Sequence, residues 1–532
     1  MIARRESAFT TQQKGITMYQ TTSYRGHIRN HKALCAELGI DSALPREEKE
    51  RALLAAAYEK WGKDAGLRLH GMYAAVLRDE TTDTTVLLRD AFGTKTLYYC
   101  LTPDGRFLCG THLKDILDAE GFSKELNERM LQHYLTLSYP GGEETFFEGV
   151  KKVLPGHVLT YRDGRITTER YWRPVFQPDN ERSAEDFAEE LHETVKTIME
   201  ELEGDGDEAD SFLSGGVDSS YVLAVSKAKT AHGCGYAFEQ LDESVLAAET
   251  AKHLGRTFDR RIVQPEEYFA QAPKVMRGME QPLGDASAVV FSIGCDSVAA
   301  AAERGEAARI VYSGEGSDEF FGGYNIYRKA EEYGKRLETF YTGNTNIMKE
   351  EEKRELLLRY DKEIQTFDLV RGFYEENRDF DPLHRMCDID IRLWLDGDIY
   401  LNVDRMSFAS GLEVRMPLTD LRVFDIASRV PAKYKAEGEH NKLVVRRAAE
   451  QVLPREVAYR KKLGFVVPIR YWLADANYNG SVMELLRSET AERFFRRKEL
   501  DRMLDAFLGG YSDLWRKVWA MYAFLEWYRQ HF

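Results

Sequence analysis

The chain has 532 residues, of which 43% are hydrophobic and 30% charged, and its formal net charge is −15. This length predicts two or three domains, and the acidic balance argues against a chain-wide nucleic-acid surface. Six scattered cysteines form no CxxC pair, so neither a zinc site nor a disulfide framework is indicated. No apolar run is long enough to span a membrane, and we expect a cytoplasmic protein.

The first 175 residues are expected to be rich in β-strands. Segments 72–80 and 84–91 read as strands, whereas 96–110 and 156–172 read as hairpins with turn residues at their centres. A polar linker with two prolines follows, and Ser183 is placed to cap a helix that begins directly after it. These signals predict a β-rich N-terminal domain that ends before this helix.

The stretch FLSGGVDSSYVL (212–223) combines an apolar lead-in, two glycines and a run that can be helical. Gly215 and Gly216 allow backbone N–H groups to approach a ligand, and a helix start favours an anion. Asp218 would repel a phosphate unless a cation such as Mg²⁺ lies between them. We therefore predict a strand–turn–helix loop that binds phosphates together with Mg²⁺.

Helix and strand segments alternate after this loop, including a helix over 219–230 and a strand over 234–239. This alternation predicts a parallel sheet with helices on both faces. Beyond residue 325 the pattern is mostly helical. The closing stretch, 514–532, carries a stripe of Trp and Leu that is typical of core packing.

A second loop, VYSGEGSDEFFGGY (311–324), also follows a β-branched strand and should lie at the same edge of the sheet. Glu315 could act as a base there, and Asp318 could join Asp218 in holding Mg²⁺ on a triphosphate. Taken alone, the stretch could equally be a solvated acidic turn. A third stretch, YRKKLGFVVPIRYW (459–472), places cations beside an apolar segment, from which a lysine could reach a phosphate.

With these motifs identified, the chain resembles the asparagine synthetase B family over nearly its whole length. The resemblance lies in SGGVDSS, MEQPLGDASA, SGEGSDEFFGGY, VDRMSFASGLEVRMPLTD and RKKLGFVVP, and in HGMYAAVLRD and TFFEGVKKVLPGHVL nearer the start. It implies an α+β Ntn-hydrolase-like sandwich, incomplete at its start, over residues 1–175. It also implies an α/β PP-loop parallel sheet with a helical C-terminal part over residues 184–532.

The resemblance implies an ATP-dependent ligase that forms an acyl-adenylate and opens it with an amine, using ATP and Mg²⁺. It places Glu315 as the group that assists amine attack, Lys462 as the stabiliser of adenylyl transfer, and Asp218 and Asp318 as Mg²⁺ ligands. The positions that correspond to the family's ATP and pyrophosphate site are Phe212, Leu213, Ser214, Gly215, Gly216, Asp218, Ser219, Phe238, Ser313 and Gly314.

The pocket for the acid is less well defined by sequence. Asp285 and Ser287, from MEQPLGDASA, either contribute to it or form the start of a helix. Asp404, Arg405 and Arg415 either line the site or pair with one another structurally.

The N-terminal region departs from the family pattern. The family places a nucleophilic cysteine after the initiator Met, where this chain has Ile2, and the family's opening few dozen residues have no counterpart. Arg25 replaces the oxyanion asparagine, His27 replaces a glutamate that contacts glutamine, and Glu50 stands where an aspartate would hold its amino group. Isoleucine cannot replace a sulfur nucleophile, so we expect glutamine hydrolysis to be lost. An upstream start could restore the cysteine, but not the substituted residues.

The amine source and the acid therefore stay open. The leading hypothesis is asparagine formation from aspartate and ammonia, and Glu315 supports it because β-lactam synthetases have a tyrosine there. The alternatives are a specialised amide ligase of the β-lactam synthetase or lasso-peptide cyclase kind, and a non-catalytic relic. We expect small-molecule partners, no nucleic acid and no membrane, and we leave a homodimer open.

Overall fold

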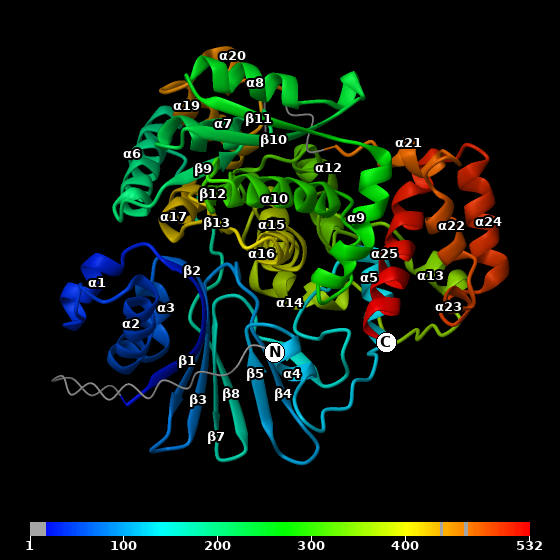
Figure 1. Ribbon diagram of the computed structural model, residues 1–532, viewed down its shortest axis with the longest axis horizontal. Helices are drawn as coiled ribbons and strands as arrows, with labels where there is room; N and C mark the ends of the chain where they lie inside the picture. Colours follow the sequence, from blue (N-terminus) through cyan, green and yellow to red (C-terminus); the bar gives the residue numbers. More distant parts are fainter. Residues whose placement is uncertain (1–17, 437–439, 462–465) are drawn as a thin grey trace.

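A computed structural model describes residues 18–436, 440–461 and 466–532. Its N-terminal domain, blue and cyan in Figure 1, contains a five-stranded antiparallel sheet of order β1-β2-β3-β7-β8 and a three-stranded sheet of order β5-β4-β6. The strands are β1 (Gln20–Ile28), β2 (Gly71–Asp79), β3 (Thr84–Arg89), β4 (Tyr98–Leu101), β5 (Phe107–Gly110), β6 (Val150–Lys152), β7 (His157–Arg162) and β8 (Arg165–Arg170). Both predicted hairpins are confirmed, as β4–β5 and β7–β8.

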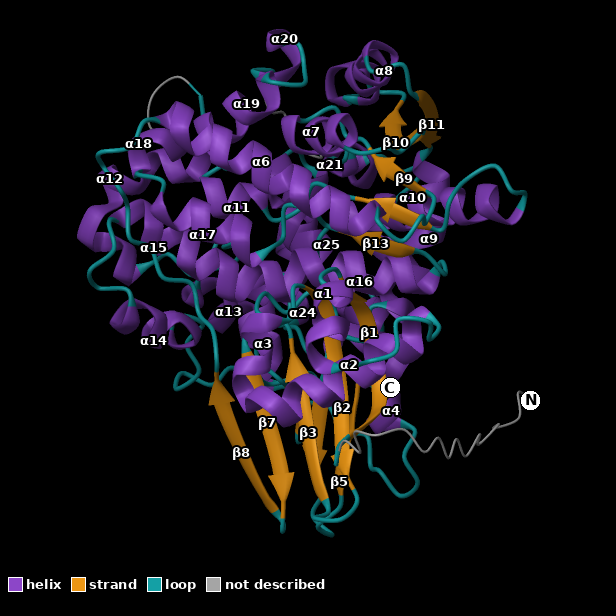
Figure 2. Ribbon diagram, turned by 90° about the vertical axis from the view of Figure 1, so that its left-hand side faces the viewer, coloured by secondary structure: helices purple, strands orange, loops and turns teal. Residues whose placement is uncertain are grey.

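The N-terminal domain is layered because the strands of its larger sheet bury both faces. Val76 and Leu87 cluster with Leu97 and Tyr99, so the two sheets pack together. On the opposite face, Leu88 and its neighbours cluster with buried residues of α1 (His31–Leu38) and α2 (Arg46–Trp61). Figure 2 shows the strands of this domain side by side below the helices of the rest of the chain.

The C-terminal domain begins at α6 (Ala184–Glu203), whose N-terminus carries the predicted Ser183 cap, completed by Asp186 as a capping box. Its sheet is entirely parallel, in the order β11-β10-β9-β12-β13. These strands are β9 (Ala209–Phe212), β10 (Thr230–Tyr236), β11 (Thr257–Val263), β12 (Ile310–Tyr312) and β13 (Glu413–Arg415). The helices that connect the strands are α7 (Val217–Val225), α8 (Ser244–His253), α9 (Pro265–Gly278), α10 (Ser287–Glu303) and α11 (Ser317–Phe321).

Two details of the sequence prediction are wrong. The helix expected over 219–230 ends at Val225, and the next strand begins at Thr230, earlier than predicted. Strand β13 lies in the region expected to be mostly helical. Its three residues pair in parallel with β12, a distant partner, and so short a strand has no periodic signal of its own.

The remainder of the C-terminal domain is helical, as predicted. Its longer elements are α13 (Glu350–Leu356), α14 (Asp368–Glu376), α15 (Pro382–Ile389), a π-helical segment (Asp390–Ile399), α16 (Tyr400–Ala409), α17 (Leu421–Arg429), α19 (Leu443–Glu450), α21 (Ile469–Ala474), α22 (Gly480–Leu486), α24 (Arg497–Leu508) and α25 (Trp515–His531).

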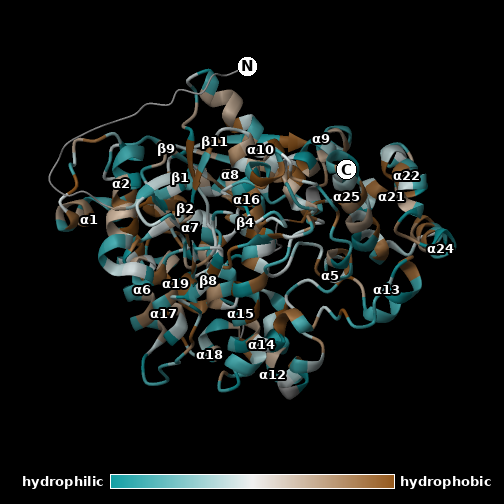
Figure 3. Ribbon diagram, turned by 90° about the horizontal axis from the view of Figure 1, so that it is seen from below, coloured by the Kyte–Doolittle hydropathy of each residue, from teal (hydrophilic) through white to brown (hydrophobic). Residues whose placement is uncertain are grey.

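The last helix, α25, belongs to the core, which confirms the prediction for its aromatic stripe. Trp519 and Trp527 are fully buried, and Phe524 lies within 6.1 Å, centroid to centroid, of Tyr134 from the N-terminal domain. Peripheral helices such as α24 alternate hydrophilic and hydrophobic residues along their length, as Figure 3 shows. Within the described residues, no helix has the length and apolar character needed to cross a bilayer.

Candidate active site

A cavity of about 750 Å³ lies at the C-terminal edge of the parallel sheet, beyond the ends of β9 and β12. In open parallel sheets this edge is where ligands bind. The predicted residues that line the cavity are Phe212, Leu213, Ser214, Gly216, Asp218, Ser219, Asp285, Ser287, Ser313, Gly314, Glu315 and Asp318. Residues from two loops that are far apart in sequence therefore share one space.

The first loop follows β9 and leads into α7, as its sequence predicts. Gly215 has φ +87°, and a Cβ there would lie 2.9 Å from the carbonyl oxygen of Glu243, so glycine is required. The Ser214 and Ser219 hydroxyl oxygens lie 3.1 Å apart, and the N–H of Gly216 points to Ser214 Oγ at 3.3 Å. Hydroxyls and amide groups thus gather at a helix start, which suits a phosphate.

The second loop packs directly against the first. A Cβ on Gly314 would lie 2.8 Å from the backbone nitrogen of Ser219, so only glycine allows this approach. Glu315 is held by the Ser313 hydroxyl, which donates to its Oε1 at 3.3 Å, and by Thr419, whose hydroxyl donates to its carbonyl oxygen at 3.0 Å. The contact places the glutamate beside the phosphate loop.

A lysine that sequence reasoning missed connects the two loops. The buried ammonium of Lys442 forms ion pairs with Asp218 and, at 2.8 Å, with Asp318 Oδ1. Asp218 Oδ1 is buried and has no hydrogen-bond partner among the described residues. Two carboxylates that already attract one cation, with an oxygen left over, are a donor set that suits Mg²⁺ on a nucleotide phosphate.

Further cations surround the same loops. Arg460 donates to the carbonyl oxygens of Gly215 at 3.1 Å and of Leu246 at 3.2 Å, and it lines the cavity together with Lys461 and Arg446. The sequence prediction of a basic stretch beside a buried segment is therefore confirmed in its described part. Lys462 itself lies outside the described residues.

Two buried carboxylates also line the cavity. Asp285 accepts hydrogen bonds from the backbone and the hydroxyl of Ser287, the first residue of α10, so it both lines the cavity and secures a helix start. Asp398, which sequence reasoning missed, accepts from Trp394 Nε1 at 2.7 Å, and its Oδ1 is buried without a described partner. Burial raises the pKa of both carboxyls.

Two predicted site residues lie elsewhere. Phe238 is 37% exposed and stacks on Tyr471 with ring centroids 5.2 Å apart, outside the cavity lining. Arg415 is fully buried at the edge strand β13, where it pairs with Glu413 at 2.7 Å and Asp207 at 2.9 Å. These two acids hold its guanidinium and Arg415 does not line the cavity, so its role in substrate binding stays a prediction.

Asp404 and Arg405 also pair structurally. Asp404 binds Arg25 and Lys95 of the N-terminal domain, whereas Arg405 pairs with Glu280 at 3.3 Å. Neither residue lines the cavity, and their ion-pair partners are other residues and not one another.

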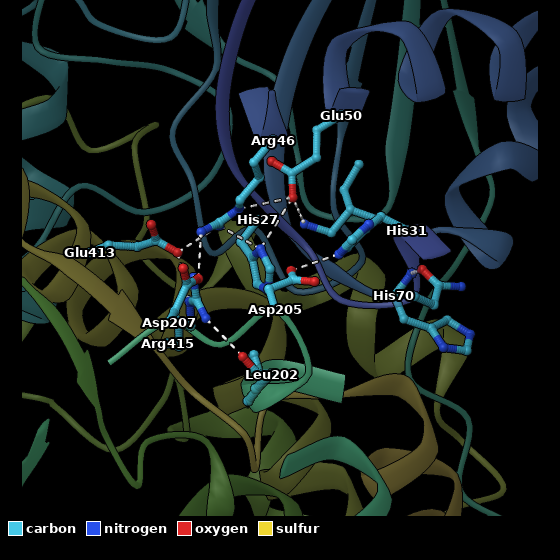
Figure 4. Close-up of polar contacts among 12 residues, drawn as sticks. His27, His31, Arg46, Glu50, His70, Leu202, Asp205, Asp207, Glu413 and Arg415 are labelled. Carbon is cyan, nitrogen blue, oxygen red and sulfur yellow. Dashed lines mark hydrogen bonds and ion pairs between the residues drawn. The ribbon is translucent and has the colours of Figure 1, made fainter. Parts of the chain in front are cut away.

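In the N-terminal domain, the residues Arg25, His27 and Glu50, which differ from the family pattern, are held by other protein groups. Arg25 makes two hydrogen bonds to the Asp404 carboxylate, at 3.1 and 2.8 Å. Glu50 accepts from the Tyr24 hydroxyl at 2.9 Å and from the Ile28 N–H at 3.0 Å, as Figure 4 shows in part. Ile2 lies outside the described residues.

His27 lies between Glu50 and Arg46 in Figure 4. His27 Nδ1 lies 2.5 Å from Arg46 Nη2 and 3.2 Å from Glu50 Oε1, so its role as donor or acceptor depends on the tautomer. Burial and the charges of Arg415 and Arg46 hold the pKa of His27 well below its ordinary value. Arg46 also pairs with Glu413 at 2.8 Å, so the network crosses from one domain to the other.

Comparison with known proteins identifies both domains. A family model described as asparagine synthase matches residues 186–529, and one described as a glutamine amidotransferase domain matches residues 11–172. The second match indicates that an amidotransferase domain is present and gives no sign of degeneracy by itself. Whether the domain hydrolyses glutamine therefore depends on individual residues.

Individual relatives agree with these matches. The chain is 29% identical to the glutamine-hydrolyzing asparagine synthetase 1 of Bacillus subtilis, over 95% of this chain and 84% of that protein. It is 24% identical to the glutamine-hydrolyzing asparagine synthetase 3 of the same organism, over 93% and 83%. A protein of Penicillium rubens named amidase chyE is 24% identical over 79% of this chain and 73% of its own length. The chain thus belongs to the asparagine synthase family and is an ATP-dependent ligase.

Proposed function

We propose that this chain activates a small carboxylic acid as an acyl-adenylate and converts it to an amide, with aspartate and ammonia as the leading substrates. The observation that carries the proposal is the contact between loops 214–219 and 313–318 at the cavity. This contact gathers a phosphate-binding loop, a carboxylate pair and Glu315 within one site. Each is needed for a different step of the reaction.

In the first step, a carboxylate oxygen of the acid attacks the α-phosphorus of ATP. A C–O–P linkage forms, the bond to the bridging oxygen of the β-phosphate breaks, and pyrophosphate leaves. Ser214, Ser219 and the amide of Gly216 are placed to hold the departing phosphates. Asp218 and Asp318 would hold Mg²⁺, which neutralises charge on the phosphates when it is bound. Lys442 and Arg460 supply positive charge beside them.

In the second step, ammonia attacks the carbonyl carbon of the acyl-adenylate. A C–N bond forms, the C–O bond to AMP breaks, and the nitrogen loses a proton. Glu315 lines the cavity at the meeting of the loops and is fixed by Ser313 and Thr419, so we assign it as the acceptor of that proton.

The acid is proposed to carry an ammonium group. Asp285 and Asp398 are buried carboxyls that line the cavity, and burial raises their pKa. A cationic group on the substrate would pair with them and favour their charged form. This requirement fits an amino acid such as aspartate.

We further propose that glutamine hydrolysis is lost. The support comes from Arg25, His27 and Glu50, whose polar groups are held by other protein groups: Arg25 by Asp404, His27 by Arg46, and Glu50 by the N–H of Ile28. An arginine committed to Asp404 cannot serve as a neutral donor to an oxyanion.

The decisive experiment measures pyrophosphate release from MgATP and aspartate, with ammonia in one reaction and glutamine in another, and identifies the product by mass. We expect asparagine with ammonia only. Asparagine formed from glutamine would refute the proposed loss of the glutaminase. No turnover by a protein that still binds MgATP would refute aspartate as the acid.

A second candidate function is amide formation on a larger acid. The cavity of about 750 Å³ is also lined by Asn344, Asn346 and Trp515, and its size gives room beyond a four-carbon acid. Release of pyrophosphate with larger amino acids, but not with aspartate, would favour this candidate.

A further inference from the structure

One helical segment connects the cavity to the N-terminal domain. It runs through the π-helical turn Asp390–Ile399 into α16, and its residues Trp394, Asp398 and Asn402 line the cavity. These three are spaced by four residues, so they lie along one side of the segment. Residues displaced by two positions are about half a turn away and lie on the opposite side.

Asp396 is the first carboxylate on that opposite side. Arg89 donates to its Oδ1 at 2.6 Å, and Lys152 pairs with its Oδ2 at 2.5 Å. Arg89 is itself fixed, because its guanidinium also donates to the carbonyl oxygens of Gly93 and Val153. Both cations belong to the N-terminal domain, and all three charged side chains are at most 5% exposed.

Asp404 is the second carboxylate, two turns further along. It receives the paired hydrogen bonds of Arg25 and an ion pair from Lys95 at 2.9 Å. Its side chain is 1% exposed. Burial alone would raise the pKa of Asp404, but the charges of Arg25, Lys95 and Arg405 outweigh burial and lower it.

This arrangement fixes the segment more tightly than a packed surface would. Bidentate and charge-assisted hydrogen bonds restrict both position and rotation, and breaking a buried pair leaves an uncompensated charge. A rotation of the segment would move Asp398 and Asn402 within the cavity and at the same time break contacts at Asp396 or Asp404.

We propose that the N-terminal domain serves the ligase as a clamp: Arg25, Lys95, Arg89 and Lys152 hold the segment Asp390–Ala409 so that Trp394, Asp398 and Asn402 stand in place for the acid. This inference rests on the proposed function, because it takes the part of the cavity lined by Asp398 as the acid site. Arg25 is then a positioning residue that replaces a lost glutaminase role with a structural one.

The test compares Arg25→Gln and Lys95→Met with the control Arg170→Gln in the full chain. Arg170 also binds a carboxylate across the domains, because its Nη1 donates to both oxygens of Glu376 on α14, but it is partly exposed and α14 does not line the cavity. We expect the two clamp variants to lose about tenfold to a hundredfold in kcat/KM for aspartate with ammonia, since small displacements of positioning groups have effects of this size. The KM for MgATP should stay within about twofold, because Ser214 and Ser219 are on another element.

Two further measurements separate positioning from simple damage. Arg25→Lys should recover part of the lost kcat/KM, and Arg25→Gln combined with Asp404→Asn should be less harmful than the sum of the single changes. Hydrogen exchange of the free protein should be faster in residues 390–409 for Arg25→Gln and unchanged there for Arg170→Gln.

The clamp is refuted if Arg25→Gln matches the wild type in both exchange over 390–409 and kcat/KM, or if it raises the KM for MgATP as much as that for aspartate. Failure of the proposed function looks different, because the wild type itself would then form no amide. The exchange comparison decides the inference in that case as well.

Discussion

The cavity of the C-terminal domain and the strand β1 region of the N-terminal domain are both rich in charged groups, but they use them differently. In the cavity, buried oxygens of Asp218 and Asp398 have no hydrogen-bond partner among the described residues. Around β1, protein groups of matching charge or donor character bind Arg25, Arg29 and Glu50, and the buried atoms left without a described partner there, His27 Nε2 and Arg29 Nε, are nitrogens and not acceptor oxygens. Because buried polar atoms are normally satisfied, unmatched oxygens in a cavity mark a place for a ligand, whereas matched ones mark structure.

The strongest test of this comparison is Asp218→Asn. The change removes a negative charge from the carboxylate pair while leaving the loop's shape intact. We expect amide formation to fall about a thousandfold, because transition-state charge on the phosphates loses its support. Pyrophosphate release measures the effect, and Asp163→Asn, in the exposed turn between β7 and β8 and outside the cavity lining, is the matched control. Equal losses in the two variants would contradict the assignment of Asp218.

The role of the ion pairs around β1 is tested by Asp420→Asn. Asp420 is buried, accepts from Arg29 across the domain interface at 2.7 Å and also binds Arg422. Removing its charge leaves the buried guanidinium of Arg29 without a carboxylate, whereas Arg422 keeps its ion pair with Glu201, and we expect a loss of about 3 kcal/mol of stability at pH 7 with little direct effect on chemistry. Thermal unfolding measures the loss.

The pH dependence of that loss has a defined sign. Burial would raise the pKa of Asp420, but the charges of Arg29 and Arg422 outweigh burial and hold it below its ordinary value of about 4. A lowered pKa in the folded state contributes stability that is present above the unfolded pKa and is lost as the pH falls below it. The difference in melting temperature between the wild type and Asp420→Asn should therefore be full at pH 7 and shrink below about pH 4. A difference that grows in acid would contradict the ion pairs.

Within the cavity, Glu315→Gln separates the two proposed steps. The variant keeps the size of the side chain but cannot accept a proton, so we expect amide formation to fall about a hundredfold. Exchange of labelled pyrophosphate into ATP, which needs only the acyl-adenylate, should fall much less. If exchange and amide formation fall together, Glu315 acts before the amine attacks.

The sequence could predict the cavity loops because their signals are local. Gly215, Gly314 and the strand–turn–helix patterns around them occupy short stretches, and the close approach of the loops requires those glycines. Two contacts that the sequence did not predict join residues over long separations. Lys442 meets Asp218 across 224 positions and Arg25 meets Asp404 across 379, distances over which no pattern in a single sequence carries information.

The same reasoning explains why Arg415 and Phe238 were expected at the site but lie outside the cavity lining. Arg415 stands in a motif that resembles the family's, and motif membership does not reveal which way a side chain on an edge strand points. Phe238 was placed at the nucleotide by position in the chain, whereas the structure stacks it on Tyr471. Positions defined by a tight turn were thus predictable, and positions defined by a neighbour from another element were not.

The smallest effect on stability is expected for Arg46→Met, which tests whether the ion pairs around β1 stabilise the fold. Arg46 begins α2 and reaches Glu413 at 2.8 Å and Asp207 at 3.3 Å in the C-terminal domain. Because its side chain is 28% exposed, solvent screens these pairs, and we expect a loss of about 1 kcal/mol.

Arg51→Met on the same helix is the control. The described partners of Arg51, Glu47 one turn away and Thr21, belong to the N-terminal domain, so this change should cost about 0.3–0.5 kcal/mol. Urea unfolding of both variants measures the difference. If Arg51→Met lowers the free energy of unfolding as much as Arg46→Met, the contacts that Arg46 makes across the domains do not stabilise the fold. The view that the charges around β1 have a structural role would then be contradicted.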